Sequence, residues 1–168
     1  EALNEIGAAI DTEQDVVMIY LASHGGGGPV LEVSLPPLEL APLTAPALRS
    51  LLDTAGIRWR IIVVSACHSG GFVDELKDDY TLVITATAVD GAGSGCGNRD
   101  DATTFGDALF QHGLAQSESF LAGYEAARAY LAGQTGRAAG GPPANPQAYV
   151  GPAMVDKLKE LDRGNAAR

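Results

Sequence analysis

The sequence predicts an α/β domain built on a mostly parallel sheet that is flanked by helices. Three continuous apolar runs, rich in β-branched residues, predict buried strands at residues 16–21, 60–65 and 80–86. Segments with helical features separate these runs, and strands joined by such crossovers lie parallel in one sheet. With 168 residues, the chain has the length of a single domain, which we assign to residues 1–168.

The composition is that of a folded, acidic protein. Hydrophobic residues make up 46% of the chain and charged residues 19%, which excludes a wholly disordered chain. The formal net charge of −10 argues against nucleic acid or an anionic membrane surface as a partner. No apolar run reaches the roughly 18 residues of a membrane-spanning helix, and two cysteines are too few for a disulfide framework.

The first half of the chain reads as helix, strand, excursion, helix and strand. Residues 1–10 have apolar side chains at helical spacing and predict the end of an amphipathic helix. Residues 30–43 alternate in polarity around two prolines, which predicts a short excursion or hairpin. Pro46 then opens a helix that Gly56 stops. A sheet of this type has a further strand and helix ahead of these, so we expect the chain to be N-terminally incomplete.

The second half continues from the third strand into a loop rich in Gly, Ser and Asp. Helices are predicted next, and then an irregular Gly/Pro-rich segment at residues 133–147. A short strand and a last helix close the chain. The predicted ranges are 88–103 for the loop, 104–115 and 117–132 for the two helices, 148–150 for the strand and 153–163 for the last helix.

A histidine and a cysteine follow the first two apolar runs at matching positions. Ser23-His24-Gly25 ends the first run, and Cys67-His68-Ser69-Gly70 ends the second. Ligands bind beyond the carboxyl ends of parallel strands, so we expect both side chains to face one group there. Acyl transfer needs a thiol that attacks a carbonyl and an imidazole that protonates the leaving amine. The neighbouring glycines leave backbone N–H groups available for a developing oxyanion.

Plainer interpretations of these residues compete with a catalytic one. A lone cysteine after a strand is usually a small buried hydrophobe. Polar residues and glycines follow Cys67 directly, however, and His24 occupies the matching place on the preceding strand, which favours a nucleophile. Residues 25–28 resemble a phosphate-binding loop only in their glycines, because no Gly-Lys-Ser/Thr follows them.

These motifs resemble the legumain (asparaginyl endopeptidase) family of cysteine peptidases, in particular its bacterial members. The resemblance rests on Ser-His-Gly and Ala-Cys-His-Ser-Gly after successive strands, and it covers residues 16–110 best. Residues 84–88, 104–109 and 146–151 also match the family pattern. The resemblance implies a caspase-like three-layer sandwich and a cysteine endopeptidase. It implies that Cys67 forms a thioester acyl-enzyme and that His24 transfers protons. It assigns the oxyanion hole to the backbone N–H groups of Gly25 and Cys67, with no metal or organic cofactor.

The resemblance also implies where substrate would bind. Family members line the primary specificity pocket at the positions of His68, Thr85 and Thr87. Asp90, Asp100 and Asp101 add carboxylates nearby, which would favour a basic or amide side chain in the substrate. Of these three, Asp100 is the predicted contact, although each of them is more simply a solvated residue of an acidic loop.

Other candidate residues and functions are weaker. Cys96 matches a family position that is not catalytic, and His112 is predicted to be structural or solvent-facing. Two alternatives stay open: a catalytically idle caspase-like interaction module, and a thiol-dependent transpeptidase that shares the acyl-enzyme. The predicted partner is a peptide or protein substrate. Bacterial relatives are often envelope-associated, and the sequence leaves the location of this domain open.

Overall fold

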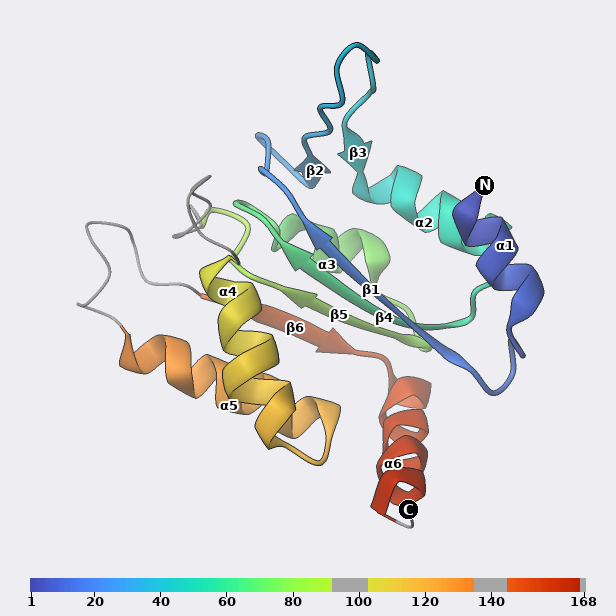
Figure 1. Cartoon of the computed structure of the whole chain (residues 1–168), viewed down its shortest axis with the longest axis vertical. Helices are drawn as coiled ribbons and strands as arrows, with labels where there is room; N and C mark the ends of the chain where they lie inside the picture. Colours follow the sequence, from blue (N-terminus) through green and yellow to red (C-terminus); the bar gives the residue numbers. More distant parts are fainter. Residues whose placement is uncertain (92–102, 135–144, 167–168) are drawn as a thin grey trace.

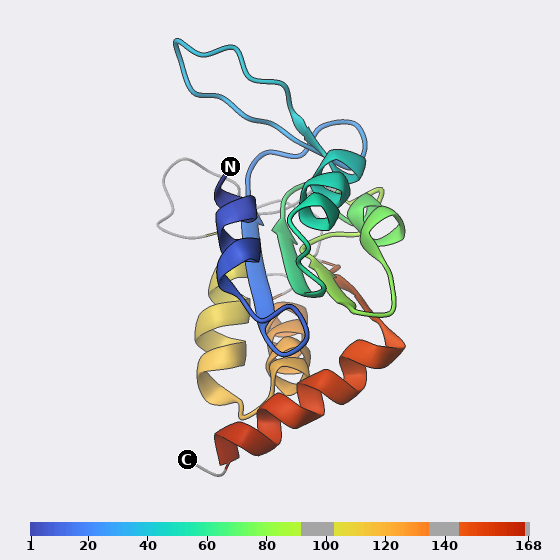
Figure 2. The same cartoon turned by 90° about the vertical axis from the view of Figure 1, so that its right-hand side faces the viewer.

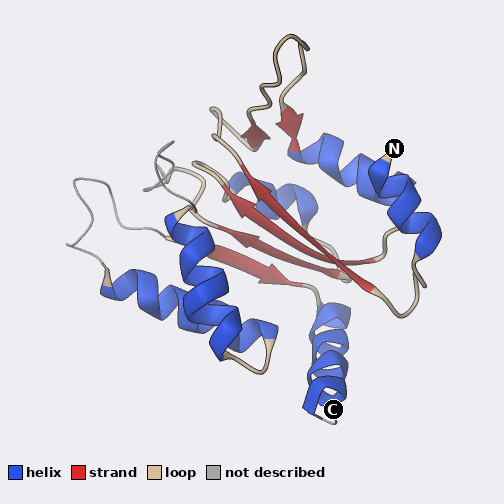
Figure 3. Cartoon of the chain, in the orientation of Figure 1, coloured by secondary structure: helices blue, strands red, loops and turns tan. Residues whose placement is uncertain are grey.

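A twisted four-stranded sheet forms the centre of the computed structural model, which describes residues 1–91, 103–134 and 145–166. Its strands lie in the order β1-β4-β5-β6 (Figures 1 and 3). The first three are parallel and β6 is antiparallel to β5. The bounds are Val16–Ala22 for β1, Trp59–Ser65 for β4, Thr81–Thr85 for β5 and Gln147–Val150 for β6. The predicted mostly parallel α/β sheet is therefore confirmed.

Helices cover both faces of this sheet, which makes the molecule a three-layer sandwich (Figures 1 and 2). One face carries α1 (Ala2–Ala9), α2 (Ala45–Thr54) and α3 (Gly71–Leu76). The other carries α4 (Thr104–Asp107), α5 (Phe120–Gly133) and α6 (Pro152–Ala166). This layering is consistent with the predicted caspase-like fold.

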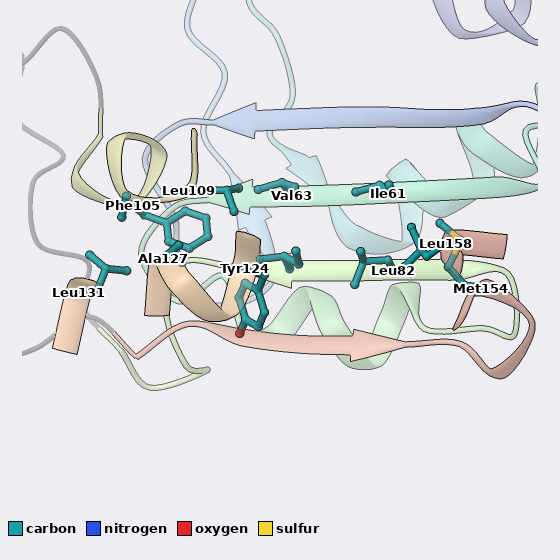
Figure 4. Close-up of a cluster of buried hydrophobic side chains, with 13 residues drawn as sticks. Ile61, Val63, Leu82, Phe105, Leu109, Tyr124, Ala127, Leu131, Met154 and Leu158 are labelled. Atoms are coloured by element: carbon teal, nitrogen blue, oxygen red, sulfur yellow. The ribbon is translucent and has the colours of Figure 1, made fainter. Parts of the chain in front are cut away.

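Alternate side chains of β4 and β5 supply both halves of the core. Ile61 and Val63 of β4 face α4, α5 and α6, whereas Ile62 and Val64 face α2 and α3. Because the side chains of a strand point alternately to opposite faces, a continuous apolar run is what a doubly covered strand requires. Figure 4 shows the first cluster, in which Met154 of α6 joins the β4–β5 face.

The first strand departs from the expected burial. None of its residues is buried, and Met18 and Tyr20 are 39% and 36% exposed. The reason is its place in the sheet: within the described residues, β1 pairs only with β4. Its apolar run predicted the strand correctly, but the expectation of burial on both faces was wrong.

Three further segments refine the sequence-based prediction. The predicted hairpin forms from β2 (Val30–Leu31) and β3 (Leu43–Thr44), and its connecting loop projects from the body of the molecule (Figure 2). The predicted helix 104–115 is α-helical only to Asp107 and continues as π-helix to Gly113. Helix α3 was not predicted, because it has only six residues and begins at a glycine.

Replacement of Met154 by alanine tests whether α6 belongs to the same cooperative unit as the sheet. Met154 is 0% exposed and packs in the β4–β5 cluster. We expect Met154→Ala to lower the free energy of unfolding by about 2–5 kcal/mol, measured by urea denaturation. Lys159→Ala, on the exposed side of α6, should change it by no more than about 0.5 kcal/mol. If Met154→Ala changes the free energy of unfolding as little as Lys159→Ala does, α6 contributes little to the core.

Candidate active site

The two predicted reactive residues leave neighbouring strands in register. In the β1–β4 ladder, Ala22 pairs with Ser65 as the last partners, so His24 and Cys67 each lie two residues beyond the end of the paired strands. The Ser23 N–H donates to the Ser65 carbonyl at 3.3 Å and extends the ladder by one bond. The parallel register therefore brings His24 and Cys67 to one edge of the sheet, as predicted.

The main chain of Gly25 packs directly against the main chain of Cys67. A methyl group at Gly25 would lie 2.7 Å from the Cys67 carbonyl carbon and 3.1 Å from its nitrogen, and closer still to its carbonyl oxygen. Only a residue without a side chain permits this approach. His24 is exposed and Cys67 is half-buried, so solvent reaches both residues at this edge of the sheet.

The β2–β3 hairpin holds the His24 segment in place. The Glu32 N–H donates to the His24 carbonyl at 2.9 Å, and the Gly26 N–H donates to the Val30 carbonyl at 3.1 Å. These bonds flank an antiparallel bridge between Gly25 and Leu31. Gly25 therefore occupies the non-hydrogen-bonded position of the bridge, and its own N–H points away from the hairpin.

His68 follows Cys67 in the left-handed region, with a φ of 57°. Its backbone N–H donates to the Gly91 carbonyl at 2.9 Å, and its Nδ1 lies 3.2 Å from the Val89 carbonyl oxygen. A carbonyl accepts only, so in the neutral ring Nδ1 carries the proton and Nε2 is left as an acceptor. The His68 side chain is half-buried, and its ring is held against the loop that follows β5.

Thr85 and Thr87 lie behind the Cys67 turn, and both are buried. Thr85 is 0% exposed and its hydroxyl donates to the Thr87 carbonyl at 3.1 Å. Thr87 is 2% exposed and its hydroxyl donates to the Ala66 carbonyl at 3.2 Å. Both hydroxyls thus have partners within the protein. Substrate contact by these two threonines stays a prediction.

The other residues singled out from the sequence lie beside this edge, apart from it, or outside the described residues. Cys96, Asp100 and Asp101 lie outside the described residues, whereas Asp90 is exposed in the loop beside His68. His112 stacks on Tyr130 with ring centroids 3.7 Å apart and lies 3.5 Å from an Asp107 carboxylate oxygen. These contacts agree with the predicted structural role of His112.

Sequence reasoning missed the polar residues that support the strand ends. Ser65 is 2% exposed and its Oγ lies 2.8 Å from the Thr103 Oγ1, which also accepts from the Gly106 N–H and caps α4. Ser69 is 0% exposed and contacts Thr87. Serine and threonine at these positions gave no periodic signal, because their partners are distant in the sequence.

The part of the chain that the structure describes contains neither a cluster of metal ligands nor a membrane-spanning helix. There, no three His, Cys, Asp or Glu side chains are grouped as ligands of a metal ion. No helix among the described residues combines the length and apolarity that crossing a bilayer requires.

Comparison with known proteins assigns the chain to a class and a family. The model of the peptidase C13 family matches residues 4–135, which include both strand ends described above. The chain therefore belongs to the peptidase C13 family, the legumain-like cysteine peptidases, and is a hydrolase of the cysteine-peptidase type. No curated protein matches the sequence significantly.

Proposed function

We propose that this domain is a cysteine endopeptidase that uses a His24/Cys67 dyad and a thioester acyl-enzyme. The observation that carries the proposal is the contact between the two strand ends: β1 and β4 are in parallel register, and Gly25 packs against the backbone of Cys67. An imidazole and a thiol that emerge from such neighbouring segments can act on one peptide bond.

In the first half of the reaction, the Cys67 thiol gives its proton to His24, its sulfur bonds to the scissile carbonyl carbon, and the carbonyl oxygen becomes an oxyanion. Collapse of this intermediate breaks the C–N bond, and His24 delivers a proton to the departing amine. In the second half, a water molecule attacks the thioester carbonyl and gives its proton to His24. The C–S bond then breaks, His24 returns this proton to the departing sulfur, and the acid product leaves the regenerated Cys67 thiol.

In this proposal, two backbone donors stabilise the oxyanion: the N–H groups of Gly25 and Cys67. Fixed N–H groups stabilise developing charge effectively because they need no reorganisation during the reaction. The non-hydrogen-bonded position of Gly25 in its bridge with Leu31 supports this role, since it turns the Gly25 N–H away from the hairpin.

We assign substrate recognition first to His68, whose Nε2 remains an acceptor when Nδ1 faces the Val89 carbonyl. An acceptor beside the acidic loop of Asp90 fits a basic or amide side chain before the cleaved bond. Asp100, Thr85 and Thr87 remain predicted contacts. Cleavage of a diverse peptide library tests this preference, and a preference for acidic side chains would contradict it.

Labelling and turnover together test the proposed reaction. A peptidyl electrophile should modify Cys67, located by mass spectrometry, and fluorogenic peptides should be hydrolysed. Labelling without turnover would identify the idle interaction module instead. Addition of a peptide amine separates hydrolysis from transfer, because a transpeptidase would give ligated product in preference to the free acid.

Replacement of His24 by alanine tests the proton-transfer role. We expect kcat for peptide hydrolysis to fall by about 10²- to 10⁴-fold, the usual contribution of a positioned acid–base group. His112→Ala is the matched control, because His112 stacks on Tyr130 away from the strand ends, and it should retain the parent kcat. An unchanged kcat in His24→Ala would refute the dyad.

A further inference from the structure

A closed network of hydroxyl hydrogen bonds lies directly behind Cys67. The Thr87 hydroxyl donates to the Ala66 carbonyl at 3.2 Å and accepts from the Ser69 N–H at 3.1 Å. The Thr87 N–H in turn donates to the Ser69 Oγ at 3.2 Å, and the two hydroxyl oxygens lie 3.2 Å apart. The Thr87 side chain is therefore hydrogen-bonded on both sides of Cys67, to the carbonyl of the preceding residue and to the N–H two residues later.

The proton of each hydroxyl in this network has one consistent position. The single hydroxyl proton of Thr87 is used on the Ala66 carbonyl, so the Ser69 hydroxyl must donate to the Thr87 oxygen. The Thr87 oxygen then accepts twice and donates once, which is its full capacity. With exposures of 0% and 2% for Ser69 and Thr87, water does not compete for these bonds, and such buried, satisfied networks are rigid.

The bond to Ala66 controls the direction of a second group, the N–H of Cys67. The Ala66 carbonyl and the Cys67 N–H belong to the same peptide unit, which is trans, because within the described residues only Pro36–Pro37 is cis. In a planar trans peptide the C=O and the N–H point in opposite directions. A carbonyl held on the buried Thr87 therefore directs the Cys67 N–H away from the core.

We propose that Thr87 is a positioning residue for the oxyanion hole. Its hydroxyl fixes the orientation of the Ala66–Cys67 peptide and so aims the Cys67 N–H at the substrate oxyanion, and Thr85 holds Thr87 through the Thr87 carbonyl. This inference rests on the proposed function and deepens it, because the positioning role of Thr87 works through the backbone of the nucleophile and does not depend on its predicted substrate contact.

Thr87→Val, which keeps the shape of the side chain and removes the hydroxyl, tests this role. We expect kcat to fall by about 10- to 100-fold, since small displacements of a catalytic donor have effects of this size, while KM changes little. Affinity for a peptide aldehyde, which forms a tetrahedral oxyanion on the thiol, should fall with kcat. Alkylation of Cys67 by iodoacetamide, which forms no oxyanion, should keep nearly its parent rate.

Two further variants separate this role from a general effect on folding. Thr87→Ser keeps the hydroxyl and should restore most of kcat. Thr81→Val removes another buried β5 hydroxyl, one bonded to Asp78 at the opposite end of the strand, and should reduce stability without changing kcat. If Thr87→Val does not fold, Thr87→Ala replaces it with the same expected split between kcat and KM.

Failure of the positioning role of Thr87 and failure of the proposed peptidase function give different experimental results. A parent kcat and parent aldehyde affinity in folded Thr87→Val would overturn the role of Thr87 while Cys67-dependent hydrolysis stands. If Thr87→Val loses iodoacetamide reactivity by the same factor as kcat, Thr87 acts on the thiol of Cys67. That result would also overturn the proposed role in the oxyanion hole. If hydrolysis by the parent protein does not depend on Cys67, the proposed function itself fails, and the inference fails with it.

Discussion

The Cys67→Ala variant is expected to lose peptide hydrolysis by about 10⁴-fold or more, because the residual rate then comes from binding and the oxyanion hole alone. The side chain is half-buried at the edge of the sheet, and its removal leaves the backbone contact with Gly25 in place. Thermal unfolding should therefore stay close to that of the parent protein. The measurement is the steady-state rate with a fluorogenic peptide.

The second cysteine of the chain provides the control for this variant. Cys67 and Cys96 are the two cysteines of the sequence, so a thiol-directed peptidyl electrophile has two possible targets. Cys96→Ala should retain both labelling and hydrolysis, and Cys67→Ala should lose both. Hydrolysis that survives in Cys67→Ala, or labelling that follows Cys96, would remove the basis of the proposed mechanism.

Gly25→Ala is expected to lower both the rate of peptide hydrolysis and the stability of the fold. The added methyl group would lie 2.7 Å from the Cys67 carbonyl carbon, a separation at which one of the two backbones must move. Because a displacement of about 1 Å at a catalytic centre can cost 10²-fold in rate, we expect kcat to fall by about that factor. Overpacking of this kind should also cost roughly 1–3 kcal/mol in the free energy of unfolding.

A neighbouring glycine separates this steric effect from a change in loop flexibility. A methyl group at Gly27 would meet no atom within 4 Å among the described residues, so Gly27→Ala should keep the parent kcat and stability. Equal activity in Gly25→Ala and Gly27→Ala would show that hydrolysis does not need the close approach of the two strand ends.

Much of the fold could be predicted from the sequence because its central strands are buried on both faces. The apolar runs of β4 and β5 are continuous for that reason, and their predicted positions agree with the structure to within one residue at each end. The run of β1 looks the same in the sequence although its side chains are partly exposed. Composition records which residues are apolar, but not which strand lies at the edge of the sheet.

In the candidate site, likewise, some residues could be predicted from the sequence and others could not. His24 and Cys67 could be found from the sequence, because each follows an apolar run and parallel strands end at a common edge. The support given by Thr87 could not be found, since its partners Ala66 and Ser69 are 21 and 18 residues away. Only the β4–β5 pairing brings them together, and no local periodicity encodes a hydroxyl bond between two loops.

The difference in burial between β1 and β4 predicts how the domain loses activity on heating. Cys67 follows a strand with six buried residues, whereas His24 follows a strand with none. Marginal elements open with less free energy than central ones, so β1 should detach from β4 before the rest of the sheet separates. We expect turnover to fail at a lower temperature than the global melting transition, with amide hydrogens of β1 exchanging well ahead of those in β4.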